Sequence, residues 1–256
     1  MIGKQVIVWA VLSLSVLSTI ISTPMLAAST WTTFKSADIT FDYPTTNGSP
    51  TIKKIKAAPL ANPDEKPDGV APEHWELSFA KSSGKIWIIP TEEKGNKKFH
   101  DAYPPIDNAV KSLGPILQKK AASPKDIPFL PWGDWSSPFF AHVKYLNAKN
   151  ANLVRFIAEY QIEPDVLSND RLIYAAQGLT TDGKYYISIS MPVKASFLPE
   201  KSDLPKWSKD KIEKFNADYE KYTASQKAKL EKLADTGYSP SLVELDKLVQ
   251  SITVKK

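Results

Sequence analysis

The spacing of hydrophobic and polar residues changes along the chain, and each change predicts a different element. In "ADITFDYP" (37–44), Ile39, Phe41 and Tyr43 alternate with polar residues, which is the period of two typical of a half-buried strand. Further strands are predicted at 51–57, 74–80 and 85–93. The last of these carries apolar residues on both faces, which predicts an interior position in a sheet.

The middle of the chain has the strongest strand pattern. Four segments there are rich in β-branched and aromatic residues, at 139–148, 152–162, 171–179 and 184–193. The last two flank Thr181-Asp182-Gly183, a sequence typical of a hairpin turn. Because consecutive strands with short connections usually pair with their neighbours, we expect an antiparallel meander.

Three other segments repeat apolar residues every three or four positions, which is the helical period. They are 106–120, 208–235 and the segment from Ser239-Pro240 to Ile252, where Ser239 and Pro240 resemble an N-cap and first helical residue. The order of elements predicts an α+β protein: an antiparallel sheet covered by helices, of the α/β/α-sandwich type. We expect residues 30–256 to form one domain, with the long charged amphipathic helix 208–235 as an insertion.

The first residues have the three-part pattern of a secretory signal peptide. Lys4 supplies positive charge, Val6 to Ile21 form an apolar run, and small residues follow Pro24 up to Ala28. The apolar run approaches the length of a membrane span, but Pro24 and the alanines favour cleavage over a retained anchor. We therefore predict that residues 1–28 are removed and that the protein is secreted or periplasmic. With no cysteine, the chain can form neither a disulfide nor a cysteine-linked lipid anchor.

Composition and motifs give no support to several classes of function. The net charge of +5 is spread among many acids, so no nucleic-acid partner is expected. The histidines His74, His100 and His142 are not at metal-ligand spacing, and the acidic loop "PDEKPDG" does not fit a calcium-binding loop. No glycine-rich phosphate loop is present, and Ser136-Ser137 lack the flanking glycines of a hydrolase nucleophile elbow. We therefore predict no metal, no cofactor and no catalytic residues.

Residues 129–199 resemble a known family. "FFAHVKYLNAKNANLVRFIAEYQIEP" and "RLIYAAQGLTTDGKYYISISMPVKASFLP" are similar to a family of exported bacterial proteins in which a "QGLT" motif precedes "YYIS". That family has no assigned activity, so the resemblance implies export and brings no site residues. More loosely, the strand ending in Tyr43-Pro44 and the closing "LDKLVQSITV" are similar to domains of the photosystem-II subunit P and Mog1 type. This second likeness implies a fold and not a function.

The segment "IPFLPWGDWSSPFF" (127–140) concentrates aromatic residues and prolines. Its prolines predict a stiff loop that leads into a strand near Phe139, with at least one phenylalanine in the core. Trp132 and Trp135 flank a Gly-Asp pair, where a turn would display both indole rings beside the Asp134 carboxylate. The two rings either stack on a ligand, with Asp134 accepting a hydrogen bond, or pack over an open edge of the fold. Trp132, Asp134 and Trp135 are thus the candidate ligand-binding residues.

Taken together, these features favour an exported, non-catalytic binding or accessory protein whose ligand is a protein, a peptide or a glycan. An extracellular hydrolase without a recognisable motif is one alternative. Another is a subunit of an envelope assembly that docks through helix 208–235. Lysines in this helix stand at i, i+4 spacing from acidic residues, which indicates a solvated face, so no membrane contact is expected after signal cleavage.

Overall fold

The computed structural model describes residues 30–57, 72–92, 104–131 and 135–255. The predicted signal peptide and two of the three candidate site residues, Trp132 and Asp134, lie outside these ranges. The elements described below are those of the described ranges.

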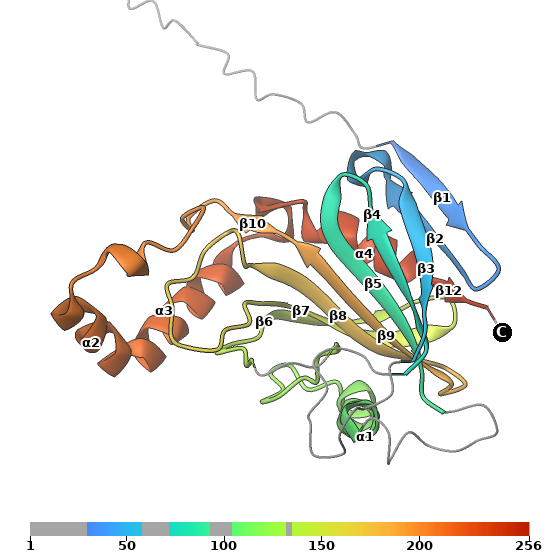
Figure 1. Cartoon of the computed structure of the whole chain (residues 1–256), viewed down its shortest axis with the longest axis horizontal. Helices are drawn as coiled ribbons and strands as arrows, with labels where there is room; N and C mark the ends of the chain where they lie inside the picture. Colours follow the sequence, from blue (N-terminus) through green and yellow to red (C-terminus); the bar gives the residue numbers. More distant parts are fainter. Residues whose placement is uncertain (1–29, 58–71, 93–103, 132–134, 256) are drawn as a thin grey trace, which may run out of the picture.

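Seven strands form the main antiparallel sheet, in the spatial order β3-β4-β5-β9-β8-β7-β6 (Figure 1). They are β3 (Pro50–Ile55), β4 (His74–Phe79), β5 (Ser82–Pro90), β6 (Ala141–Asn147), β7 (Ala151–Ala158), β8 (Ile173–Thr180) and β9 (Tyr185–Pro192). Strands β6 to β9 are neighbours in space as they are in sequence, which confirms the predicted meander. Strand β5 pairs with β4 and β9, so its predicted interior position is also confirmed.

A smaller sheet joins the two ends of the described chain. It contains β1 (Trp31–Lys35), β2 (Ile39–Pro44) and β12 (Thr253–Val254), with β2 in the centre. A further pair is formed by β10 (Lys194–Ala195) and β11 (Tyr238–Ser239). The sequence pattern predicted β2 but not β1, because "WTTFK" buries no residue fully and so shows little alternation.

Four α-helices accompany these strands in the described ranges: α1 (Pro104–Lys119), α2 (Lys209–Ala217), α3 (Tyr219–Lys232) and α4 (Leu242–Ser251). The predicted segment 208–235 is helical, but as two helices, because the backbone leaves the helical region at Asp218 (φ −100°, ψ 10°). Helix α4 begins later than expected from Ser239-Pro240. The Ser241 side chain accepts a hydrogen bond from the N–H of Glu244 (3.2 Å), which caps the helix there.

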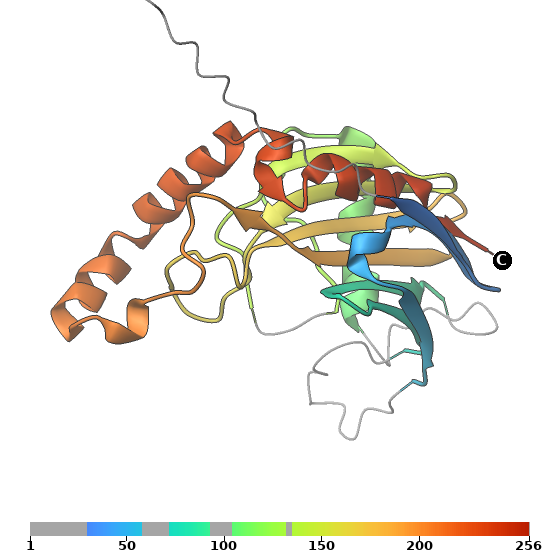
Figure 2. The same ribbon diagram turned by 90° about the horizontal axis from the view of Figure 1, so that it is seen from above.

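The main sheet has a hydrophobic core on each face. On β7, Leu153 and Ile157 pack in the cluster that contains α4, whereas Val154, Phe156 and Ala158 pack in the cluster that contains α1. This alternation is the period of two expected of a strand buried on both faces. In Figure 1, α1 lies beneath the sheet, and α4 and the three-stranded sheet lie on the other side, as the turned view in Figure 2 also shows. The α+β sandwich predicted from the sequence is confirmed.

The α4 face buries a charged network. Arg155 is 2% exposed, and its Nε and Nη2 contact the carboxylates of Asp246 (3.1 Å) and Asp235 (3.0 Å). Its Nη1 donates to the carbonyl of His142 (2.6 Å), and the Tyr174 hydroxyl donates to Asp246 (3.0 Å). These contacts fix α4 and the short 3-10 turn Asp235–Gly237 after α3 to strands β6, β7 and β8, since each partner comes from a different element.

A second polar cluster lies at the end of β7. The Glu159 carboxylate is fully buried and accepts hydrogen bonds from Gln161 Nε2 (2.8 Å) and the N–H of Ser168 (3.1 Å). Arg171 Nε lies 3.0 Å from Glu159, and the same guanidinium contacts Asp165. Burial raises the pKa of Glu159 in spite of these contacts.

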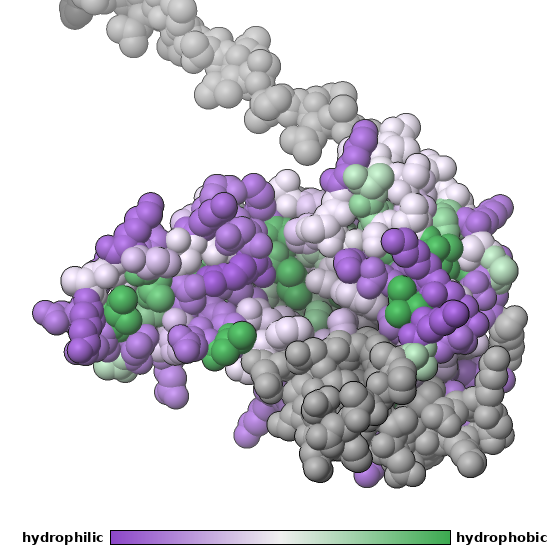
Figure 3. All heavy atoms as spheres, in the orientation of Figure 1, coloured by the Kyte–Doolittle hydropathy of each residue, from purple (hydrophilic) through white to green (hydrophobic). Residues whose placement is uncertain are grey.

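Helices α2 and α3 form an arm that extends from the sheets (Figures 1 and 2). Figure 3 shows its surface to be mostly hydrophilic. Its aromatic rings pack on one another: the Phe215 ring centroid lies 5.5 Å from Trp207 and 5.0 Å from Tyr222. No helix within the described ranges is long and apolar enough to span a membrane.

Candidate functional site

The first part of the aromatic segment is core. Ile127 and Leu130 are buried against the α1 face of the sheet. The Tyr186 hydroxyl donates to the carbonyl of Pro128 (3.3 Å), and Ser188 Oγ donates to the carbonyl of Leu130. These bonds satisfy the backbone of a proline-rich loop that cannot form a ladder of its own.

The structure describes the chain again from Trp135 onward, and Ser136 forms an isolated β-bridge with Gln161 there. The N–H of Ser136 donates to the carbonyl of Gln161 and the N–H of Gln161 donates to the carbonyl of Ser136, both at 3.0 Å. Strand β6 pairs Ala141 with Ile157 on the same side of β7. Ser136 therefore lies on the N-terminal extension of β6, beside the C-terminal extension of β7. The predicted core phenylalanine is confirmed a little further on, because Phe139 is buried.

A cavity of about 360 Å³ opens between these two parts of the segment. It is lined by Lys125, Asp126, Ile127, Pro128, Phe129, Trp135, Ser136, Ser137, Phe140 and Tyr160. Its volume is at the lower end of the range of ligand pockets, about 300–1,000 Å³. An apolar wall with a few polar groups is the usual composition of such a pocket.

Tyr160 is the polar group deepest in this wall. Its ring packs against Phe129, with ring centroids 4.6 Å apart. Its hydroxyl is buried and has no hydrogen-bond partner among the described residues. Burial, together with the negative charge of Asp126, raises the pKa of Tyr160 far above its ordinary value. The phenol therefore stays protonated at all physiological pH values, and its oxygen has almost no solvent-accessible surface.

Two exposed hydrophobic side chains, Trp135 and Ile162, lie at the Ser136–Gln161 bridge beside the cavity. In the register of the Ser136–Gln161 bridge, Trp135 lies opposite Ile162 and Ser137 lies opposite Tyr160. Trp135 is 43% exposed and Ile162 is 81% exposed. Neighbouring positions across a bridge share one face, so these two side chains extend the apolar wall of the cavity into solvent.

The structure places one predicted site residue, Trp135, in the cavity wall. Whether Trp132 and Asp134 join it stays a prediction, since both lie outside the described ranges. Sequence reasoning missed Lys125, Asp126 and Tyr160. Tyr160 had a usable signal: in "RFIAEYQI" it shares the period-two face of Phe156 and Ala158. No group of three potential metal ligands occurs within the described part of the chain.

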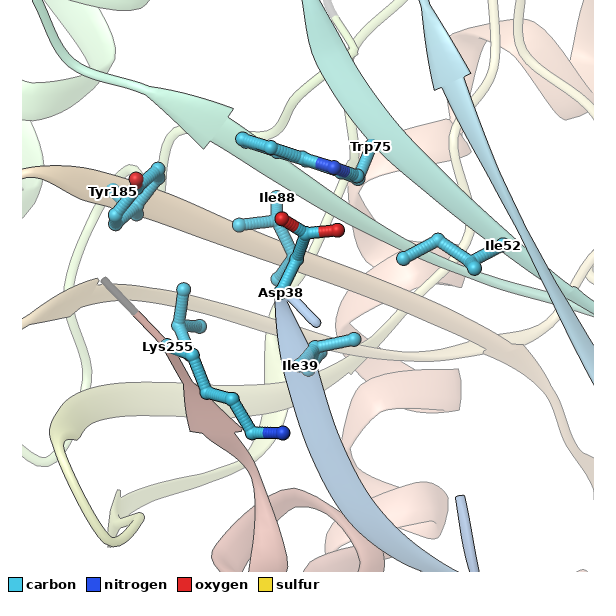
Figure 4. A pocket seen from close by; sticks show the side chains of 8 residues that line it. Asp38, Ile39, Ile52, Trp75, Ile88, Tyr185 and Lys255 are labelled. Atoms are coloured by element: carbon cyan, nitrogen blue, oxygen red, sulfur yellow. The ribbon is translucent and has the colours of Figure 1, made fainter. Parts of the chain in front are cut away.

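Other hollows on the described surface are less suited to a ligand. Figure 4 shows one, where the Asp38 carboxylate lies beside the Trp75 ring and the Tyr185 ring lies nearby. The two rings meet edge to face at 6.0 Å and leave no room for even a water molecule between the lining side chains. Another hollow of about 310 Å³, beside Tyr43 and Lys81, is wide and has a single aromatic residue.

Comparison with known proteins adds little beyond the fold. No family model matches the chain, and no curated protein matches it. Among solved structures, it is similar to the solution structure of cyanobacterial PsbP (CyanoP) from Synechocystis sp. PCC 6803. The TM-score is 0.32 and the identity 10%, over 92% of this chain and 99% of that one. A TM-score this low carries no argument about the fold or the function of this chain. The resemblance to a family of exported proteins stays a prediction.

Proposed function

We propose that this protein is an exported, non-catalytic binding protein whose ligand enters the cavity beside Trp135. The observation that carries the proposal is the Trp135 ring, which is 43% exposed in the wall of a cavity of about 360 Å³. An aromatic ring that is partly exposed beside a concave surface buries apolar area on a ligand at low entropic cost, which is why the arrangement supports a binding site.

The rim supports the same proposal. Trp135 and Ile162 both expose large apolar areas beside the cavity. Exposed apolar side chains that border a concave site are typical of ligand and protein contacts. Export is supported by the signal-peptide pattern of residues 1–28.

The arm is the weaker candidate for a functional surface. Its aromatic rings pack on one another, with Phe215 against Trp207 and Tyr222, and the Tyr222 hydroxyl accepts a hydrogen bond from the N–H of Leu167 (2.9 Å). An assembly helix that docks elsewhere would need a free apolar stripe.

The proposal is tested by following backbone amide signals of the purified protein during titration with single-ring compounds that carry one hydrogen-bond acceptor. Shifts are expected at Ser136, Ser137 and Tyr160, and Trp135→Ala should weaken binding about tenfold through loss of the ring contact with the ligand. Trp75→Phe, at the hollow in Figure 4, is the matched control and should leave the affinity unchanged. Shifts that gather around Trp75 and Tyr185, or no shifts at millimolar concentration, would overturn the proposal.

A further inference from the structure

The backbone beside the cavity is an unpaired sheet edge. Ser136 uses its N–H and C=O on Gln161, so the N–H and C=O groups of Trp135 and Ser137 point away from that partner. Among the described residues, no hydrogen bond involves these four groups, and the Ser137 side chain donates to the carbonyl of Phe139 (2.6 Å). Unpaired N–H and C=O groups along an edge are a template for another strand.

Three of the other sheet edges, at β6, β12 and β3, are covered or guarded. On β6, the carbonyl of His142 accepts from Arg155 and its N–H hydrogen-bonds to the carboxylate of Glu231 at the end of α3. On β12, the side chain of Asn150 donates to the carbonyl of Val254 (2.6 Å) and accepts from its N–H (3.1 Å). The β3 edge carries two exposed lysines, Lys53 and Lys54, in the manner of edge strands that avoid pairing. The edge at Trp135–Ser137 has none of these protections.

We propose that Trp135–Ser137 binds an extended peptide as an additional strand, an inference that rests on the proposed binding function and names its ligand class. Peptide residues opposite Trp135 and Ser137 share their face of the sheet, so two side chains, separated by one residue, point toward the cavity. Their apolar parts fill the space between Phe129, Phe140 and Tyr160.

The free backbone edge favours a peptide over a glycan. The cavity wall presents polar and apolar surface in similar amounts, so the lining by itself does not separate the two ligand classes. An extended peptide places its polar backbone on the free edge and its side chains in the cavity.

The test uses an array of peptides about nine residues long, within the usual length of a strand. Each peptide carries two apolar or aromatic residues separated by one residue, and the same purified protein is applied to a glycan array. Affinities of the best peptide are then measured by calorimetry for wild type, Trp135→Phe and the control Trp75→Phe. We expect Trp135→Phe to weaken binding and Trp75→Phe to leave it unchanged.

Backbone pairing is tested by methylating one peptide nitrogen at a time. Methylation of the two residues that face the cavity should weaken binding about tenfold or more, because each loses a donor and places a methyl against the edge. Methylation of the residue between them should have little effect, since its N–H points away from the edge. Equal effects at all three positions would contradict strand addition.

The two proposals fail in different ways. If single-ring compounds bind at Tyr160 but no peptide does, the peptide inference is wrong and the binding function stands. If a glycan binds and no peptide does, the peptide inference is likewise wrong and the binding function stands. If neither compounds nor peptides shift the signals of Ser136, Ser137 and Tyr160, both proposals are wrong.

Discussion

The two faces of the main sheet are built from the same strands but are completed differently. On the α4 face, Arg155 of β7 finds partners on three other elements, and the Tyr174 hydroxyl is bound to Asp246. On the α1 face, the continuation of the same strand carries Tyr160, whose hydroxyl has no partner in the described part of the chain. One face is closed by matched polar groups, and the other ends in a cavity with an exposed rim. On the proposed function, the α4 face serves stability and the α1 face serves binding.

The largest effect is expected from breaking the charged network of the closed face. Asp246→Ala removes the acceptor of Tyr174 and the more buried carboxylate of Arg155, so the buried guanidinium keeps only Asp235 as a charged partner. Loss of one partner of a buried pair typically costs about 3–5 kcal/mol. Urea unfolding should show this loss, and Glu163→Ala, at an exposed position, should change stability by less than about 0.5 kcal/mol. Similar values for both variants would contradict the assignment of stability to the α4 face.

A comparable loss is expected from the hydrophobic side of the same face. Leu248 is buried under α4, and Leu248→Ala should cost about 2–5 kcal/mol because it leaves a void in a packed core. Val243, on the same helix, is 53% exposed, so Val243→Ala serves as the matched control. Thermal unfolding followed by circular dichroism measures both. The prediction is wrong if the two melting temperatures fall by the same amount.

Two tyrosine-to-phenylalanine substitutions compare the faces directly. Tyr174→Phe deletes a hydroxyl bound to a carboxylate, and a hydrogen bond to a charged group contributes about 1.5–3 kcal/mol. Tyr160→Phe deletes a hydroxyl without a partner, so the protein should be as stable as wild type or slightly more stable. Free energies of unfolding in urea decide the matter. A clear loss of stability in Tyr160→Phe would mean that the hydroxyl is satisfied within the protein.

The smallest expected effect is a loss of folding stability at low pH through protonation of Asp165. Partial burial opposes ionisation of Asp165, but hydrogen bonds from Arg171, Ser202 and the N–H of Val166 hold its pKa below the ordinary value. A carboxylate with a lowered pKa stabilises the fold above its unfolded pKa of about 3.9, and this stability is lost as pH falls through the folded pKa. Between pH 5 and strongly acidic conditions, wild type should therefore lose slightly more stability than Asp165→Asn. Urea midpoints at several pH values measure this difference. Identical pH profiles for the two proteins would show that Asp165 does not contribute to stability through these hydrogen bonds.

The fold was largely predictable because it depends on local periodicity. The alternation along β2, the apolar residues on both faces of β5 and the helical spacing of Ile106 and Leu113 are local signals that identify strands and helices. The break at Asp218 was not predictable, because an aspartate between Ala217 and Tyr219 fits an ordinary exposed helical position.

The candidate site was predictable only in part. Trp135 was identified because two tryptophans and an aspartate around a glycine are an unusual local composition. Tyr160 could not be joined to it, because the two meet through a single bridge between Ser136 and Gln161, and one bridge leaves no periodic pattern. The buried Arg155 was missed for a similar reason: its partners Asp235 and Asp246 come from distant segments. That residues 30–256 form one domain stays a prediction.

The most direct measurement of the central claim is iodide quenching of tryptophan fluorescence, with wild type and Trp135→Phe measured side by side, free and with a bound single-ring compound. If the α1 face is open for binding, Trp135→Phe removes a quencher-accessible part of the emission and changes stability by less than about 0.5 kcal/mol. The bound compound then shields that emission in wild type. The claim is contradicted if Trp135 is already shielded in the free protein and its replacement lowers stability as a core substitution does.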